Sequence, residues 1–235
     1  MRSFIAWLVL LAALGAAAWV LAPMAARPLI ADAVRAVSPF GTEPLEVDVE
    51  VSAPGLLRGT IDSIHVTGTN LSSERLRVGR LDMTAREVGV IDHSFASMTG
   101  SLDAVMLLRG DGTLLQARQV DVEGPSDALE ATTDVPPDAS LQLVRDALDS
   151  AGLPAGNLAL VDGGVRVTIL GQRTVVALGA ANGAVTAAGS IAGGGSIVVF
   201  GPEPGDPWRI TGVSVSPNGM RVQARIELAG LLRCR

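Results

Sequence analysis

The chain has 235 residues, of which 48% are hydrophobic and only 3% aromatic, and its net charge is -6. An acidic chain with few aromatic residues lacks the basic surface and the base-stacking side chains of a nucleic-acid-binding protein, so we expect no nucleic-acid partner. Its single cysteine, Cys234, excludes an intramolecular disulfide and a cysteine-based metal site. Every basic residue is arginine, which is typical of a GC-rich bacterial genome.

The first predicted element is an uncharged apolar run from Ser3 to Ala26. As a helix rising about 1.5 Å per residue, this run can cross a hydrocarbon core of about 30 Å. Small residues near its end suit a signal peptidase, but the run is longer than the usual core of a signal peptide. We therefore predict that residues 1–26 are a membrane anchor, with a cleaved signal as the alternative, and that the remainder lies outside the cytoplasm.

Residues 27–44 are predicted to form a juxtamembrane helix and a linker. Pro23 and Pro28 break the helical run, and Leu29, Ala33 and Val37 then recur at helical spacing. We expect a short amphipathic helix beside the membrane.

Residues 45–235 are predicted to form one β-rich domain. Apolar and acidic residues alternate strictly in the segment LEVDVEVS, which begins at Leu45, and this is the period of a half-buried strand. The same period continues through residues 59–71 and 75–85, as expected for an antiparallel meander. Two further strands, in residues 101–109 and 113–123, flank a Gly-Asp-Gly turn and predict a hairpin.

A polar, proline-containing stretch from Gly124 to Pro137 is the best candidate for a linker between subdomains. It leads to the one convincing soluble helix, which we expect to be capped by Asp138 and to end before Gly152. One face of this helix is apolar and contains Leu141, Val144 and Leu148.

Strand-like alternation resumes after the helix in residues 164–170 and 173–180. Asn-Gly pairs at 182–183 and 218–219 each separate two such runs and predict tight hairpin turns. The expected fold class is therefore α+β, with about ten antiparallel strands and one internal helix.

No catalytic motif accompanies these elements. The two histidines, His65 and His93, have no nucleophile at a motif spacing, and neither a nucleophile elbow, a P-loop nor an HExxH sequence occurs. We expect a protein that is not an enzyme and that needs no cofactor or metal.

The apolar faces of the strands need cover, because a sheet must bury its hydrophobic face against another layer. A single helix covers only part of such a sheet. The remaining cover is either the sheet folded on itself or a bound lipid, and pattern alone leaves both alternatives open.

The segment PGLLRGTIDSIHVTG, from Pro54 to Gly68, resembles the opening signature of the LmeA-like phospholipid-binding family of bacterial envelope proteins. The segment GVSVSPNGMRV, from Gly212 to Val222, resembles the closing strand pair of that family. The resemblance covers residues 29–232. It implies a fold similar to tubular lipid-binding domains, in which a curved antiparallel sheet wraps a helix and acyl chains lie in the groove between them.

On this basis the expected partners are phospholipid and the membrane, and the expected location is the bacterial cell envelope. Acyl chains would lie between the helix residues Leu141, Val144 and Leu148 and the strand residues Ile64, Val66, Leu76 and Val78, any of which can instead be plain core. Arg58 is the candidate for the head-group phosphate, since a guanidinium can bind phosphate in bidentate fashion, although a solvated arginine is the alternative.

Two other functions stay open. A ligand-free structural or interaction module of the envelope would have a dry, fully packed core. An enzyme acting on lipids or glycolipids would need a carboxylate pair that the sequence does not place.

Overall fold

The computed structural model describes residues 26–35, 40, 45–74, 76–90, 94–108, 114–169, 171–189, 195–203, 206 and 208–227. The predicted anchor or signal segment lies outside these residues, apart from Ala26. In the described ranges, no helix combines the length and the apolar character that a membrane crossing requires.

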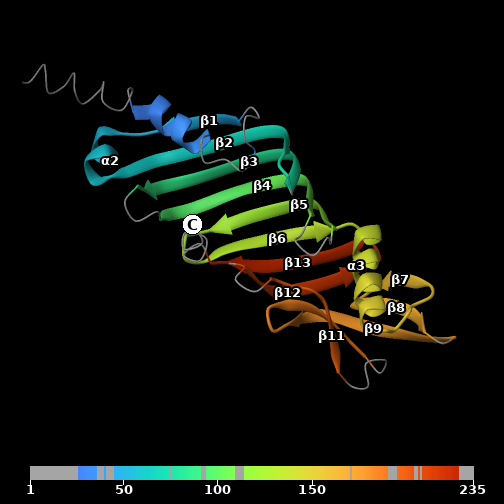
Figure 1. The fold of residues 1–235 in the computed structure, drawn as a ribbon. Coiled ribbons are helices and arrows are strands. Elements are labelled where there is room, and N and C mark those ends of the chain that lie inside the picture. Colours follow the sequence, from blue (N-terminus) through green and yellow to red (C-terminus); the bar gives the residue numbers. More distant parts are fainter. Residues whose placement is uncertain are drawn as a thin grey trace, which may run out of the picture.

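Thirteen strands of the described chain form two antiparallel sheets (Figure 1). The long sheet has the order β1 (Leu45–Glu50), β2 (Thr60–Ser72), β3 (Leu76–Gly89), β4 (Phe95–Leu108), β5 (Leu114–Gly124), β6 (Leu129–Val135), β13 (Gly219–Ile226) and β12 (Trp208–Ser216). The short sheet has the order β11 (Ser196–Phe200), β10 (Ala184–Ala188), β9 (Gln172–Ala181), β8 (Gly164–Ile169) and β7 (Leu158–Val161). The prediction of a β-rich, antiparallel fold is confirmed, and the sheets are open.

The predicted strand period is confirmed most clearly in β1. Leu45, Val47 and Val49 are buried, whereas the acidic residues between them are exposed. The predicted hairpins are also present: β4 pairs with β5, β9 with β10, and β12 with β13. Asn182 and Gly183 both have positive φ, 53° and 76°, as a type I′ turn requires.

The stretch from Gly124 to Pro137 is not a linker, contrary to our expectation. It contains β6, which pairs with β5 on one side and with β13 on the other. Two threonines and Asp134 make the sequence of this strand polar, and a polar composition is usually read as a loop. Threonine, however, is a good strand former. β6 therefore joins the N-terminal meander to the C-terminal hairpin.

The helix α3 (Pro137–Ser150) begins earlier than predicted. Pro136 occupies the N-cap position without a side-chain cap, and Asp138 lies in the first turn. Pro137 suits the start of a helix because its fixed φ is helical and its missing N–H would have no partner there. Gly152 has φ +72° just after the helix, as predicted.

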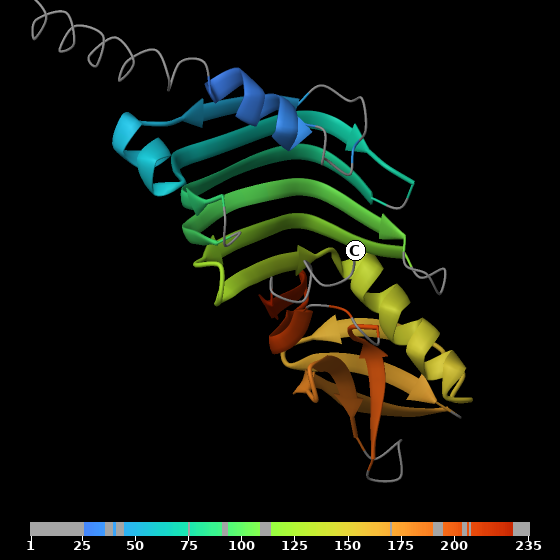
Figure 2. The same cartoon turned by 60° about the vertical axis from the view of Figure 1, so that its left-hand side comes forward.

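Residues 26–35 form a helix, and the face that packs on the sheet is not the predicted apolar stripe of Leu29, Ala33 and Val37, of which Val37 lies outside the described residues. Ala31 is buried and Ile30 and Val34 pack beside it, whereas Leu29 and Ala33 are exposed. The helix lies on the inner face of the long sheet at its β1 end (Figures 1 and 2). Tertiary packing against β1–β3, rather than the sequence's own apolar spacing, fixes its orientation.

Two separate hydrophobic clusters hold the molecule together. One joins the helix of residues 26–35 to β1, β2 and β3, and the other joins α3 and the short sheet to β12 and β13. Backbone hydrogen bonds also link the sheets, since the Ile210 amide donates to the Gly183 carbonyl and the Gly163 amide to the Val215 carbonyl, both at 3.0 Å. The inner face of β4 and β5 lies between the two clusters.

The long sheet bends along one row that crosses four strands. At this row the inward-facing residues are three positions apart instead of two: Gly68 to Leu71, Val78 to Leu81, Leu102 to Val105, and Ala117 to Val120. Asn70 and Ala104 lie in the row with φ of 53° and 51°, and Gly79 lies between them, where a Cβ would be 3.0 Å from that of Ala104. We refer to Asn70, Gly79, Ala104 and Arg118 as the bend row; Figure 2 shows the resulting curvature.

Candidate functional site

The inner face of the curved sheet carries an apolar groove of about 420 Å³. Sixteen residues line it, and only Gln116 and Thr133 among them are polar; none is charged. Strands β4, β5, β6, β13 and β12 contribute most of the wall, while Leu143 of α3 and Phe200 of β11 close one side. A space of this size falls within the range of about 300–1,000 Å³ usual for small-molecule sites.

Small residues at matched positions create the hollow. Ala131 in β6 lies directly opposite Ala224 in β13, and Ala117 in β5 lines the same space. Because neighbouring strands place paired residues on one face, the pair Ala131 and Ala224 leaves a depression that larger side chains would fill. Val222 and Ile226 flank Ala224 on its strand and continue the apolar wall.

Two half-buried aromatic side chains, Phe200 and Trp208, also line the groove. Trp208 is paired in register with Ile226, the last residue of β13. Only four aromatic residues follow the N-terminal apolar run in the sequence, namely Phe40, Phe95, Phe200 and Trp208. Two of these four therefore belong to the groove, a concentration that sequence reasoning missed.

The structure does not bring the predicted lipid-contacting residues together. Leu141, Val144 and Leu148 belong to the cluster of α3 and the short sheet, and Val144 and Leu148 are fully buried there. The predicted strand residues belong to the other cluster, namely Ile64, Val66, Leu76 and Val78. The reason is that α3 contacts β13, β11 and β7 rather than β2 and β3.

Arg58 lies in the last turn of a short helix, α2 (Ala53–Arg58), which packs against β2. Its Nε donates to the Pro54 carbonyl at 3.2 Å, and the side chain is exposed. Because α2 is near the β1 end of the strand order and the groove is near the β12 end, Arg58 is not a groove residue. Pro54 and Gly55 lie in the first turn of α2, after the Ser52 N-cap.

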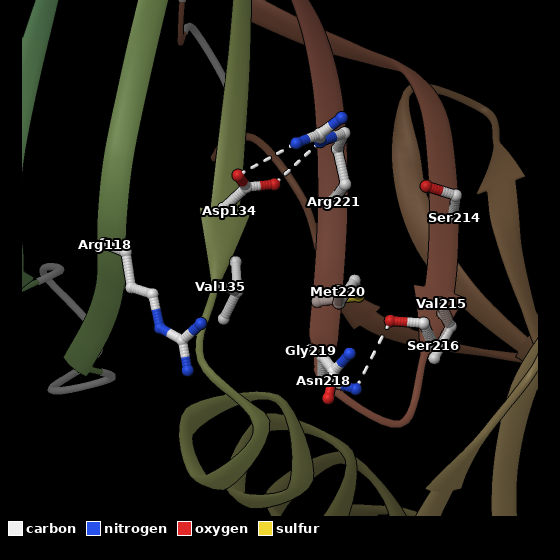
Figure 3. Close-up of a pocket in the computed structure, with 10 residues that line it drawn as sticks. All are labelled: Arg118, Asp134, Val135, Ser214, Val215, Ser216, Asn218, Gly219, Met220 and Arg221. Carbon is white, nitrogen blue, oxygen red and sulfur yellow. Dashed lines mark hydrogen bonds and ion pairs between the residues drawn. The ribbon is translucent and has the colours of Figure 1, made fainter.

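A polar cleft of about 380 Å³ lies where β6, β13 and β12 are adjacent (Figure 3). Asp134 and Arg221 form a bidentate ion pair there, with N–O distances of 2.7 and 3.0 Å. Hydrogen bonding from Arg221 lowers the pKa of Asp134, and the charges of Arg221 and Arg118 act in the same direction. Arg221 alternates with Met220 and Val222, so this ion pair faces away from the groove.

His65 is a half-exposed residue of β2 whose Nδ1 lies 2.9 Å from Oγ1 of Thr84. Asp82 is 3.9 Å from the same nitrogen. His93 lies outside the described residues. Within the ranges that the structure covers, no group of three or more histidine, cysteine or acidic residues could hold a metal ion.

No family model matches this chain, and no curated protein or solved structure gives a match either.

Proposed function

We propose that this protein binds phospholipid without catalysing a reaction, and that the acyl chains lie in the apolar groove of the long sheet. The observation that carries the proposal is a hollow of about 420 Å³ with no charged residue in its wall. Burial of each acyl methylene there contributes about 0.8 kcal/mol, so several carbons suffice for useful affinity.

The resemblance of residues 54–68 and 212–222 to the LmeA-like family supports the same function. It adds the expectation of a fold similar to tubular lipid-binding domains, in which a curved sheet wraps a helix and acyl chains lie in the groove between them. It also supports a location in the bacterial cell envelope, where residues 1–26 would anchor the domain or direct its export. Lipid transfer between membranes is an extension of this proposal, because an open sheet lets a lipid enter from one side.

Filling the groove tests the proposal. Ala131→Trp and Ala224→Trp each place a large apolar side chain in the hollow, and both residues are half-buried, so the strands can accept the added volume. Gln223→Trp is the matched control, because Gln223 is the exposed neighbour of Ala224 on the opposite face of β13.

Lipid bound to the purified proteins would be quantified by native mass spectrometry and by extraction. We expect wild type and Gln223→Trp to carry phospholipid, and the two groove variants to retain less than about one tenth of it, a loss of about 1.4 kcal/mol or more. A lipid-free wild type, or groove variants that carry as much lipid as the control, would contradict the proposal.

A further inference from the structure

Three large apolar side chains are exposed on segments that lie near the β1 end of the molecule. The exposed fractions are 72% for Leu29 of the helix 26–35, 78% for Leu57 of α2 and 54% for Val90, which directly follows β3. A shallow hollow of about 380 Å³ is lined by Leu29, Val90 and Leu56. Leu56 is the residue that precedes Leu57 in α2. The amide of Val90 donates to the Gly59 carbonyl at 3.0 Å, which fixes the end of β3 beside α2.

The local structure holds Leu57 outward. The Ser52 hydroxyl caps α2 at one end, and Gly59 ends it in a left-handed conformation with φ of 70°. Ala53 and Gly55 form the buried side of this six-residue helix, so Leu57 has no core to enter. A rigid turn that presents a leucine to solvent is an unfavourable arrangement in water, and exposed apolar groups gathered in this way mark interaction sites.

The chain itself indicates what covers this surface. The uncharged apolar run ends at Ala26, and Ala26 also lines the hollow. If the run enters a bilayer, less than one helical turn separates it from Leu29, so the hollow must lie at the membrane surface.

The charges around the hollow fit the same partner. Arg27 and Arg58 are exposed next to Ala26 and Leu57, and the adjoining end of β3 carries the exposed neighbours Arg86 and Glu87, which are opposite in charge. Apolar side chains flanked by arginines are typical of surfaces that rest in the lipid head-group region.

We infer that this end of the domain docks on the lipid bilayer, with Leu29, Leu57 and Val90 inserted at the interface and Arg27 and Arg58 at the head groups. The inference rests on the proposed anchoring role of residues 1–26, but it does not depend on lipid binding in the groove, which involves other strands.

Depth-dependent fluorescence quenching tests this orientation in the full chain. In a Cys234→Ser background, single cysteines at Leu57→Cys and Val90→Cys would carry a fluorophore, with Val175→Cys and Val198→Cys as matched controls. The control residues are valines of the short sheet with exposed fractions of 51% and 60%. The proteins would be reconstituted in vesicles of phosphatidylcholine and phosphatidylglycerol that contain nitroxide-labelled acyl chains.

We expect quenching at positions 57 and 90 to exceed that at positions 175 and 198 by about threefold or more. The double substitution Leu29→Glu and Arg58→Glu, made in the protein labelled at position 90, should reduce quenching there to the level measured at positions 175 and 198. It should not lower the melting temperature. Equal quenching at all four positions would overturn the inference. So would cross-linking between two copies through position 57, which would assign the surface to a second copy.

Discussion

Asp134 in β6 accepts two hydrogen bonds from Arg221 in β13, at 2.7 and 3.0 Å, across the one strand pair that joins the two ends of the chain in the long sheet. The pair lowers the pKa of Asp134. A carboxyl whose pKa is lower in the folded state adds stability above its ordinary pKa, and that stability is lost as the pH falls through the lowered pKa.

Asp134→Asn should therefore lower the melting temperature at neutral pH, but by no more than about 2 °C, because both partners are exposed to solvent. The difference from wild type should disappear at acidic pH and shrink in about 1 M salt. Thermal unfolding monitored by circular dichroism measures it. If Asp134→Asn and Arg221→Gln had fully additive effects, the two side chains would not be interacting in solution.

Val144→Asp should strongly destabilise the protein. Val144 is completely buried between α3 and the short sheet, and an unpaired carboxylate there should cost about 3 kcal/mol or more. Arg145→Asp, at the exposed neighbouring position, is the control. Urea unfolding that gave similar midpoints for both variants would show that α3 is not docked as described.

Ala104→Gly should raise stability, because Ala104 has φ of 51° in the middle of β4 and glycine adopts this conformation without strain. We expect the free energy of unfolding to rise by up to about 1 kcal/mol. This figure already allows for the opposing effect of the greater conformational entropy of glycine in the unfolded chain. Ala85→Gly, in β3, should instead lose about 0.5–1 kcal/mol. A loss at both positions would contradict the positive φ of Ala104.

Removal of residues 1–25 should leave a folded protein. Removal of residues 1–39 should leave a protein of lower stability. The second truncation removes Ile30, Ala31 and Val34, which cover the apolar face of β1–β3. We expect a lower melting temperature and more binding of a hydrophobic dye for the shorter protein. Identical melting curves would show that this helix contributes no packing.

Replacement of His65 and His93 by glutamine should leave phospholipid binding and vesicle-to-vesicle exchange within about threefold of wild type, a difference below about 1 kcal/mol. His65 contacts Thr84, and it does not line the groove. Release of lysolipid or free head group by the wild type, with loss of that activity in the double variant, would favour a lipid-modifying enzyme instead.

Local patterns in the sequence predicted much of the fold. The alternation around Val47 and the Asn-Gly pair at 182–183 each depend on a few neighbouring residues, and both predictions are confirmed. β6 was not predicted, because its polar residues are typical of a loop. In the structure it is a central strand, since it pairs with β5 on one side and with β13 on the other.

The groove could not be predicted from sequence, because it depends on which strands are neighbours. Ala131 and Ala224 are 93 positions apart in the numbering and become opposite only when β13 pairs with β6. The predicted site placed α3 against β2 and β3, and no local signal indicated that its partners are β13 and the short sheet.

The bend row also restricts how the strands can align during folding. In a flat sheet, a slip of two residues keeps every side chain on its original face, so hydrophobic burial alone does not reject it. Here such a slip would move Asn70 and Ala104 away from Gly79. Their positive-φ conformations would then lie opposite residues with regular extended backbone in the neighbouring strand. The bend row therefore fixes the register of β2, β3, β4 and β5. It disfavours the shifted registers that their repetitive apolar pattern would otherwise allow.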